Sequence, residues 1–265
     1  LYFTSGTTGQ PKPILLTHRN MVSACISENA HHHQTREDNF ILIPPLYHTG
    51  AKMHWFGSFI VGGRAVILKG VSPEWILEAF SEEKGTLIFL LVPWATDILL
   101  KIDSGEIKLK DYDIKQWRLM HIGAQPVPPS LVRHWKERFP KMSYDTNYGL
   151  SESTGPGCVH LGIENEHKVG AIGLPGFNWE TCIVDEEGNP VKKGEVGELV
   201  VRGDGVMKEY YKNPEATAAA IKGGWLCTGD IVRVDEDGCI WLIDRKKDII
   251  ICGGENIFPV EIENF

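Results

Sequence analysis

The chain has 265 residues, 42% of them hydrophobic and 23% charged, which is enough to bury a substantial core in one large or two smaller globular domains. The formal net charge is −8 and no long run of Lys or Arg occurs, so neither nucleic acid nor an anionic membrane is expected as the main partner. The six cysteines are scattered without a Cys-x-x-Cys pair, which argues against a disulfide framework or a structural zinc site and favours a reduced, cytoplasmic setting.

No apolar stretch approaches the roughly 20 residues of a membrane-spanning helix, and no signal peptide is visible, so no transmembrane segment is expected. The chain starts at Leu1 without an initiator Met, and Phe265 falls inside a helix expected to begin at Pro259. We therefore expect an internal piece of a longer protein.

The first half of the chain alternates strand-like and helix-like segments. Short β-rich runs at residues 40–43, 65–68, 87–92 and 119–122 predict strands. Helices are expected between them, at 17–28 with Thr17 as N-cap, at 73–83 opened by Pro73, and at 128–139. Such alternation predicts a largely parallel α/β sheet with ligand loops at the strand ends.

From about Gly155 onward the pattern becomes β-rich. Turn signals are frequent, as in DEEGNP at 185–190 and DEDG at 235–238. Strands are expected at 180–184, 197–202 and 239–243, and a single Ala-rich helix at 214–221 interrupts them.

The loop YFTSGTTGQPK at residues 2–12 gathers hydroxyl groups, two glycines and a lysine. Its glycines let the backbone approach a ligand, its hydroxyls donate hydrogen bonds, and its lysine supplies a mobile cation. The residues concerned are Ser5, Gly6, Thr7, Thr8, Gly9 and Lys12. The spacing is not that of a Walker P-loop, so taken alone this segment is either a solvated turn or a polyphosphate-binding loop.

Three further motifs follow in order: YGLSE at 148–152, GWLCTGD at 224–230, and DRKKD at 244–248 with GGEN at 253–256. Together with the first loop they resemble the adenylate-forming superfamily, which includes acyl-CoA synthetases, luciferases and the adenylation domains of peptide synthetases. The resemblance covers residues 2–265. It implies a mostly parallel sheet flanked by helices, as part of the large N-terminal domain of these enzymes, followed by a β-rich, barrel-like subdomain.

The resemblance also implies a division into three parts. Residues 1–154 would form an α/β subdomain that binds the nucleotide and the acyl group and lacks its N-terminal portion. Residues 155–243 would form the β-rich subdomain, and residues 244–265 the hinge with the start of a truncated C-terminal domain.

ATP or AMP, Mg²⁺ and CoA are the ligands that the resemblance implies. The first loop would clamp the β- and γ-phosphates through Thr7, Thr8 and Lys12. Many relatives have Gly after this lysine, whereas the chain has Pro13, so the following strand is expected to start differently or to lie at a sheet edge.

Glu152 is the expected magnesium ligand, because a hard cation prefers carboxylate and phosphate oxygens. Ser151 stands where relatives usually have Thr and keeps the hydroxyl that would touch the α-phosphate. Without the resemblance, the pair would be interpreted as a helix N-cap with its first-turn acid.

The rest of the nucleotide would be held by residues from several motifs. Asp230 would accept both ribose hydroxyls and Arg245 would reach the same ribose, although on their own they suggest a turn aspartate and a surface ion pair with Asp244. Tyr148 would lie against adenine. The small residues at the end of a strand would let the nucleotide lie flat, so the expected set also includes Gly123, Ala124, Asn147 and Gly149.

His48, in PLYHTG at 45–50, separates subfamilies, because amino-acid-activating relatives generally place an aspartate nearby. The aromatic-His pattern favours a CoA ligase in which His48 lines or gates the carboxylate pocket; the alternative is a packed or hydrogen-bonded histidine. Met53, His54 and Trp55 are candidates for the acyl site, and Gly155 and Gly157 suggest room beside the acyl group.

Lys247 corresponds to the hinge of the family, where rotation would let one site serve two half-reactions. Gly253 and Gly254 would then meet the pantetheine arm of CoA. The C-terminal lysine that promotes adenylation in relatives would lie beyond Phe265, so this piece alone is expected to be poorly active.

The triple His31-His32-His33 is expected to be an exposed helix end rather than a metal site. For function, the motifs predict an AMP-forming acyl-CoA ligase, which is an acid-thiol ligase, with a place in fatty acid metabolism. The alternatives are an adenylating enzyme that loads a carrier-protein thiol and a non-catalytic nucleotide-binding homologue. The acid and the oligomeric state stay open.

Overall fold

The structure is a computed structural model that describes residues 1–4, 12–246, 250–252 and 255–257. Several predictions fall outside the described residues. They concern Ser5, Gly6, Thr7, Thr8, Gly9, Lys247, Gly253, Gly254 and the helix expected from Pro259.

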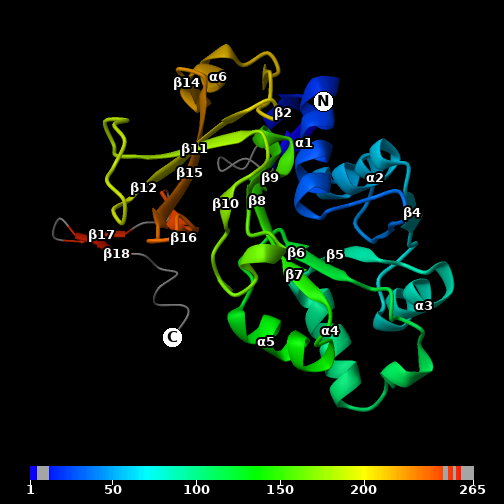
Figure 1. Ribbon diagram of the computed structural model, residues 1–265. Helices are drawn as coiled ribbons and strands as arrows, with labels where there is room; N and C mark the ends of the chain where they lie inside the picture. Colours follow the sequence, from blue (N-terminus) through cyan, green and yellow to red (C-terminus); the bar gives the residue numbers. More distant parts are fainter. Residues whose placement is uncertain (5–11, 247–249, 253–254, 258–265) are drawn as a thin grey trace.

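A five-stranded sheet, parallel throughout, forms the centre of the first half (Figure 1). Its strands lie in the order β4-β3-β5-β6-β7 and are β3 (Asn39–Leu42), β4 (Arg64–Ile67), β5 (Leu87–Leu91), β6 (Leu119–Gly123) and β7 (Ser143–Asp145). The predicted parallel α/β sheet is therefore confirmed.

Helices cover both faces of this sheet (Figure 1). On one face lie α3 (Pro73–Glu83), α4 (Val92–Asp103) and α5 (Pro129–Arg138); on the other lie α1 (His18–His31) and α2 (Thr49–Val61). Successive residues of a strand point to opposite faces, so Ile88 and Leu90 pack toward α3–α5 whereas Leu87 and Phe89 pack on the α2 side.

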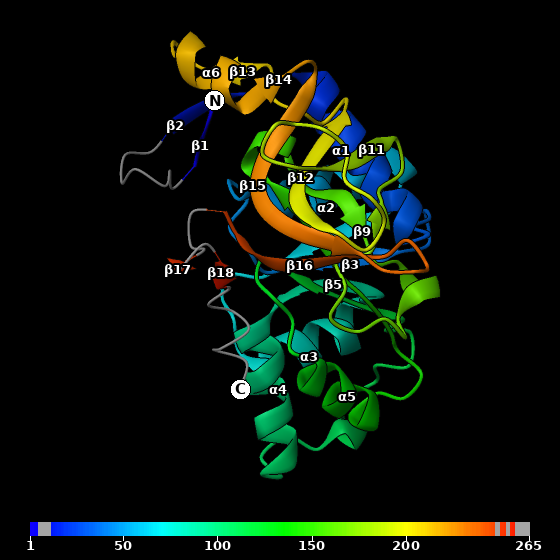
Figure 2. The same cartoon turned by 90° about the vertical axis from the view of Figure 1, so that its left-hand side faces the viewer.

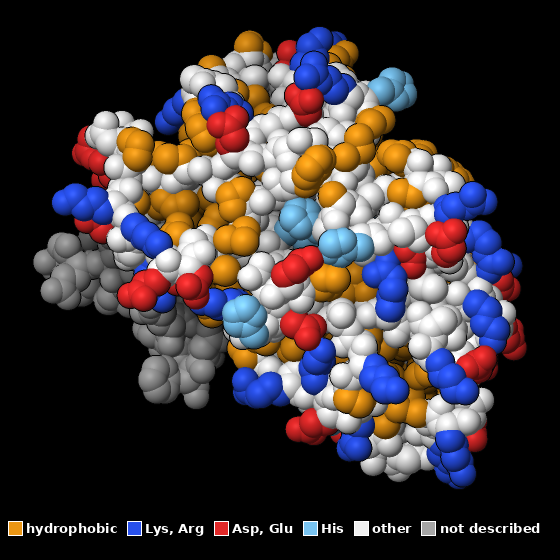
Figure 3. Space-filling view, in the orientation of Figure 1, with side chains coloured by type: hydrophobic (Ala, Val, Ile, Leu, Met, Phe, Trp, Pro, Cys, Tyr) orange, Lys and Arg blue, Asp and Glu red, His pale blue; other side chains and the backbone are white. Residues whose placement is uncertain are grey.

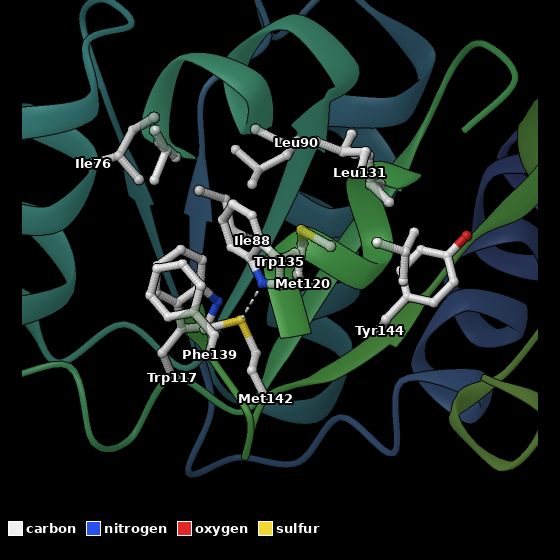
Figure 4. Packing of buried hydrophobic residues seen from close by; sticks show 14 of the residues in the cluster. Ile76, Ile88, Leu90, Trp117, Met120, Leu131, Trp135, Phe139, Met142 and Tyr144 are labelled. Atoms are coloured by element: carbon white, nitrogen blue, oxygen red, sulfur yellow. Dashed lines mark hydrogen bonds between the residues drawn. The ribbon is translucent and has the colours of Figure 1, made fainter. Parts of the chain in front are cut away.

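The larger core lies between the sheet and α3–α5 (Figure 4). Trp135 is fully buried there, its ring 4.5 Å from that of Phe139, and its indole Nε1 donates to the sulfur of Met142 at 3.2 Å. The indole N–H thus has an acceptor, and a polar group that has lost contact with water requires one.

A strongly curved antiparallel sheet dominates the second half (Figure 2). Its strands are β11 (Trp179–Val184), β12 (Val196–Gly203), β14 (Ile221–Lys222), β15 (Trp225–Val234) and β16 (Ile240–Arg245). β15 pairs with β12, β14 and β16, and its interior side chains join a second core around Trp179 and Leu199. The predicted β-rich subdomain is confirmed.

Smaller elements connect the two sheets. A three-stranded sheet contains β8 (Asn147–Leu150), β9 (Gly155–His160) and β10 (Leu174–Pro175); another contains β1 (Tyr2–Thr4), β2 (Lys12–Leu15) and β13 (Glu209–Tyr210). A two-stranded ladder joins β17 (Ile250–Cys252) and β18 (Glu255–Ile257). The remaining helices are the short η1 (Leu109–Asp111), η2 (Ser151–Ser153), η3 (Ile163–Asn165) and α6 (Pro214–Ala220).

Local signals placed most helix starts correctly. The Thr17 side chain accepts from the backbone N–H of Asn20, as predicted for an N-cap, and the helix opened by Pro73 covers the predicted residues. The strand predicted over 87–92 is wrong at Val92, which begins α4. Residue 93 is a proline, which lacks the N–H of a strand ladder but fits the first turn of a helix.

The expectation of an edge strand after Lys12 is wrong. β2, which contains Pro13, lies between β1 and β13. The Pro13 carbonyl accepts from the N–H of Tyr211, just beyond β13, at 2.8 Å. Because the N–H and C=O of a strand residue point the same way, the bond lost to proline falls at the end of the β13 ladder, where it costs least.

The surface carries mixed charges. On the face shown in Figure 3, Lys and Arg side chains are interspersed with Asp and Glu over the helical layer. Among the helices in the described part of the chain, none combines the length and apolar character that crossing a membrane requires.

Replacing Trp135 with Ala should lower the free energy of unfolding by about 3–5 kcal/mol, because the change leaves a large cavity between three aromatic and sulfur-containing neighbours. Chemical denaturation of the complete protein measures the effect. Trp75→Ala is the matched control: Trp75 is 52% exposed, so its loss should cost no more than about 0.5 kcal/mol. Equal losses in both variants would contradict the assigned core.

The Asp38 side chain, in the loop before β3, accepts hydrogen bonds from residues just before β5 and β6. Its carboxylate accepts from Arg118 Nε at 3.0 Å and Nη2 at 2.8 Å, and from the Thr86 hydroxyl at 2.7 Å. Burial opposes ionisation, but the hydrogen bonds from Arg118 hold the pKa of Asp38 below its ordinary value. The stabilisation is therefore present above the ordinary pKa and is lost as the pH falls through the lowered one.

Asp38→Asn should destabilise the protein at neutral pH by about 1–3 kcal/mol, a range that allows for the partial exposure of Arg118. The difference from the unsubstituted protein should shrink below about pH 4. Unfolding midpoints measured between neutral pH and pH 3 test this. Asp113→Asn, which breaks an exposed pair with Lys84, should leave the midpoint nearly unchanged. A pH-independent difference for Asp38→Asn would refute the ionic contribution.

Candidate active site

A cavity of about 640 Å³ opens where β15 and β16 meet β8 and η2. Predicted residues from four separate motifs line it: Lys12, Gly149, Ser151, Glu152, Asp230 and Arg245. The remaining lining residues are Leu150, Glu198, Tyr210, Ala219, Ala220, Leu226, Cys227, Thr228, Gly229 and Lys246. Chain segments more than 200 residues apart in sequence thus supply one site.

Asp230 and Arg245 face each other across the β15–β16 ladder, where they are register partners. Arg245 Nε lies 3.3 Å from Asp230 Oδ1, and the Asp230 side chain is 5% exposed whereas that of Arg245 is 54% exposed. The carboxylate is therefore held in place, and the guanidinium lies at the cavity lining with about half of its side chain exposed.

Tyr148 reaches Asp230 from β8. Its phenol hydroxyl donates to Asp230 Oδ2. Burial, and then the Asp230 charge, raise the pKa of Tyr148 well above its ordinary value, so the phenol keeps its proton and stays a donor. Asp230 is thus oriented from two sides, by Arg245 and by Tyr148.

Glu152 lies in η2 and also lines the cavity. Its Oε1 accepts from the Tyr210 hydroxyl at 2.7 Å, and its backbone carbonyl accepts from the N–H of Met207 at 2.7 Å. Lys12 Nζ lies 5.3 Å from the centre of the Tyr210 ring. A carboxylate and an ammonium group therefore share one wall of the site.

Glu198, in β12, lines the cavity and accepts hydrogen bonds from neighbouring lining residues. Its Oε1 accepts from the N–H of Gly229 at 3.0 Å, and its Oε2 accepts from Lys246 Nζ at 3.1 Å. The Thr228 hydroxyl donates to the carbonyl of Leu199 at 2.6 Å. These bonds hold the part of β15 that contains Thr228, Gly229 and Asp230.

Five predicted site residues in the described part of the chain do not line this cavity: His48, Gly123, Ala124, Asn147 and Tyr148. Gly123 ends β6, and a Cβ there would come within 3.4 Å of Asn147 Oδ1. Ala124 has a positive φ of 66°, an uncommon conformation for a residue with a side chain. Asn147 points its amide away, donating to Glu28 Oε1 at 2.8 Å.

His48 serves as the N-cap of α2. Its Nδ1 accepts from the N–H of Gly50 at 3.2 Å, and partial burial lowers the pKa of its ring. The hydrogen bond of the alternative is thus visible in the structure, although His48 is exposed rather than packed, while a role at a carboxylate pocket stays a prediction.

The acyl-site candidates lie in α2. Met53 and His54 are fully buried, and Trp55 stacks on Phe56 at 4.7 Å. A Cβ at Gly155 would lie 3.0 Å from Thr49 and 3.1 Å from Met53, and Gly155 has a φ of 110°. Glycine is required at this position by close packing and by backbone conformation.

The expectation of an exposed helix end at His31–His33 is wrong for His32. His33 is exposed and pairs with Glu164 at 2.7 Å, but His32 is fully buried. Residues four apart lie on one face of a helix, so His32 follows Glu28 into the interior, where its Nε2 lies 3.6 Å from Glu28 Oε2.

Sequence reasoning missed Tyr210, Glu198 and Lys246 as contributors to the site. Tyr210 contacts Glu152 across 58 positions of sequence, and nothing in the surrounding residues marks it. Lys246 lies next to Arg245 in the DRKKD motif. Its position just beyond β16 is the signal that could have identified it as a site residue.

The arrangement suits a ligand with hydroxyls at one end and negative charge at the other. A buried carboxylate held by two donors can accept hydrogen bonds from hydroxyls at one end. Lys12 and Glu152, at the other end, offer an ammonium group and a hard oxygen ligand.

Comparison with known proteins identifies the family. A model of the family described as AMP-binding enzyme matches residues 1–211, most of the chain. The chain belongs to this family.

Similar proteins include feruloyl-CoA synthase of an Amycolatopsis species, 33% identical over the whole chain and 52% of the relative. The 2-succinylbenzoate–CoA ligase of Geobacillus kaustophilus is 34% identical over 99% of the chain and 52% of the relative. Among solved structures, the O-succinylbenzoate coenzyme A synthetase of Bacillus subtilis, in complex with ATP and magnesium, is 30% identical with a TM-score of 0.88. The match covers 100% of this chain and 53% of the synthetase chain.

An amide bond synthetase of Marinactinospora thermotolerans is also similar, at 29% identity and a TM-score of 0.87 over 98% of this chain and 51% of the synthetase. The chain spans about half the length of the curated relatives it matches.

Tyr148→Phe should destabilise the protein by about 1.5–3 kcal/mol, because it removes a hydrogen bond to a buried carboxylate. Tyr211→Phe is the matched control, since Tyr211 is 39% exposed and its change should have little effect. Denaturation of both variants in parallel gives the comparison. Unchanged stability in Tyr148→Phe would mean that the bond to Asp230 contributes nothing net.

Proposed function

We propose that the complete protein is an AMP-forming acyl-CoA ligase. A carboxylate oxygen of the acid attacks the α-phosphorus of ATP, the bond to the bridging oxygen breaks, and pyrophosphate leaves. The thiol sulfur of CoA then attacks the acyl carbon of the adenylate, loses its proton, and AMP leaves. The observation that carries the proposal is the cavity that joins the Asp230–Arg245 pair to Lys12 and Glu152.

The proposed nucleotide position follows from the two ends of the cavity. Asp230 accepts the ribose hydroxyls, with Arg245 beside it, and Tyr148 keeps the carboxylate oriented through its hydroxyl. The adenine lies between Tyr148, Gly149 and the end of β6 at Gly123 and Ala124. Asn147 begins β8 and donates a hydrogen bond to Glu28, which holds β8 in position. Ser5, Gly6 and Gly9 belong to the proposed phosphate loop.

At the phosphate end we propose Lys12, Thr7 and Thr8 as partners of the β- and γ-phosphates and Ser151 as partner of the α-phosphate. Glu152 fits as one ligand of Mg²⁺, because it brings a carboxylate to the cavity wall, and magnesium commonly uses one or two carboxylates plus phosphate oxygens and water. The ion would supply charge neutralisation. The similar Bacillus synthetase is in complex with ATP and magnesium, which supports this part.

The acid and CoA complete the proposal. The named relatives act on feruloyl and succinylbenzoyl groups, so aromatic acids are the first candidates, and a place in fatty acid metabolism stays a prediction. His48 and α2 would border the acid. Lys247 would act as the hinge between the half-reactions. We also propose the division into parts at 1–154, 155–243 and 244–265, and a cytoplasmic location.

The primary test is acid-dependent exchange between ATP and pyrophosphate in the complete protein, with CoA consumption followed in parallel. Exchange with an aromatic acid and matching CoA consumption is expected. Exchange without CoA consumption would indicate that the acyl acceptor is not CoA. The acceptor would then be a carrier-protein thiol or an amine, the latter as the name of the similar amide bond synthetase suggests. AMP binding without exchange for any acid would point to a non-catalytic homologue.

Asp230→Ala should reduce kcat/KM for ATP about 30- to 100-fold, because it removes charge-assisted hydrogen bonds worth about 2–3 kcal/mol. Asp204→Ala provides the control, since Asp204 forms an exposed pair with Arg19 away from the cavity lining. If both variants retain the activity of the unsubstituted protein, Asp230 does not hold the ribose.

A further inference from the structure

Behind the active site, six acidic and histidine side chains from five elements converge in the interior. They are Glu28 of α1, His32 at the C-terminal end of that helix, His54 of α2, His121 of β6, Asp145 of β7 and His160 of β9. We call them the histidine cluster. Each is at most 1% exposed. The nucleotide site uses none of them directly, so their burial requires another explanation.

The two carboxylates of the cluster have only histidines as ionic partners. Glu28 and Asp145 each lie near the same three histidines, which are His32, His121 and His160. Two buried negative charges require positive charge nearby. An imidazolium can supply one such charge, whereas a divalent cation would balance both carboxylates.

Several polar atoms of the cluster make no hydrogen bond of good geometry. They include His121 Nε2 and both ring nitrogens of His32 and His54. Glu28 Oε2 and Asp145 Oδ2 make none either, although they lie 3.3 Å and 3.2 Å from His160 Nε2 and Nδ1. Buried polar atoms are nearly always paired, so this concentration of unpaired lone pairs in one place indicates a missing partner. Imidazole nitrogens and carboxylate oxygens are all metal ligands.

The distances fit a metal centre. Glu28 Oε2 lies 3.3 Å from His160 Nε2, 3.6 Å from His32 Nε2 and 4.0 Å from His121 Nε2. A zinc ion bound at about 2.0–2.2 Å holds tetrahedral ligand atoms about 3.3–3.5 Å apart. The ligand atoms of Glu28, His32 and His160 all lie within 4.8 Å of one another. Small side-chain shifts would close the site.

A second set of contacts orients these ligands. Asn147 donates to the other oxygen of Glu28, leaving Oε2 directed at the histidines. Asp145 faces the Nδ1 atoms of His121 and His160, the latter at 3.2 Å, so the Nε2 atoms of both rings face Glu28. A carboxylate behind a metal-binding imidazole is the usual arrangement of outer contacts in zinc proteins.

The local fold keeps this space closed. Glu28 and His32 are four residues apart on α1, hence on one helix face. A Cβ at Gly157, whose φ is 107°, would come within 2.7 Å of Glu28 Oε1. Glycine at this position therefore lets β9 approach α1 closely enough for His160 to reach Glu28.

We propose that the histidine cluster is a buried zinc site, with Glu28, His32 and His160 as ligands and His121 as the fourth. All four ligands are buried and no position faces the cavity lining, so the metal is structural. It would tie α1 to β9, the partner of β8, which carries Tyr148 into the active site. The proposal does not depend on the enzymatic reaction.

Metal content is the decisive measurement. The complete protein, produced without a histidine tag, is loaded with Zn²⁺, passed over a chelating resin and analysed by elemental mass spectrometry. About one zinc per chain is expected. His160→Ala and Glu28→Gln should each retain less than about a tenth of this, because removing a ligand or its charge typically costs at least tenfold in affinity. His33→Ala, an exposed histidine beside the cluster, should retain the full amount.

Two further readouts keep the test decisive if a cluster variant fails to fold. Cobalt-loaded unsubstituted protein should show the visible absorption of tetrahedral Co²⁺, and prolonged chelation should lower its thermal midpoint, reversed by Zn²⁺. Less than about a tenth of a zinc per loaded chain, with no chelator effect, would overturn the proposal and make the cluster a metal-free network of imidazolium and carboxylate. Full metal retention in folded His160→Ala would also overturn it.

Discussion

Burial of the parallel sheet on both faces is the constraint on which the rest of the structure depends. Strand side chains alternate between faces, so along β6 Met120 and Ile122 enter the core beneath α3–α5 whereas His121 points to the α1–α2 side. The first face is filled with apolar side chains. The second combines an apolar cluster around Phe40 and Phe89 with buried polar groups. One sheet thus separates a stabilising core from a layer in which charge is concentrated.

The active site depends on this layer through β8. Asn147 begins the strand and is held by Glu28, Tyr148 carries the hydroxyl that orients Asp230, and the strand leads into Glu152. Asp230 and Arg245 come from the other sheet, fixed by their register across β15 and β16. The cavity is therefore formed between two rigid β structures, and each end of a bound nucleotide would contact a different one. Cavity side chains such as Asp230 and Arg245 are therefore positioned by strands rather than by loops.

The elements most open to prediction were those with a local physical signal. Thr17 caps its helix through its own side chain, and the helix at Pro73 starts where proline's missing N–H costs nothing. Within the site, motif residues such as Asp230 and Glu152 were predicted because the family places them at fixed spacings. Tyr210 was not, because its contact with Glu152 depends on how β13 packs beside β2. His32 was misjudged because helix ends are usually exposed.

By itself, the sequence determined the family, the alternation of strands and helices and the identity of six of the cavity-lining residues, because these depend on local composition and on motif spacing. Only the tertiary structure decided that Pro13 lies in a central strand, that His48 caps α2, and that Glu28, His32, His121, Asp145 and His160 meet in the interior. The physical reason is that burial and ionic partnership are properties of packing. The five residues of the last group come from four elements, and no segment of sequence records which faces of those elements will meet.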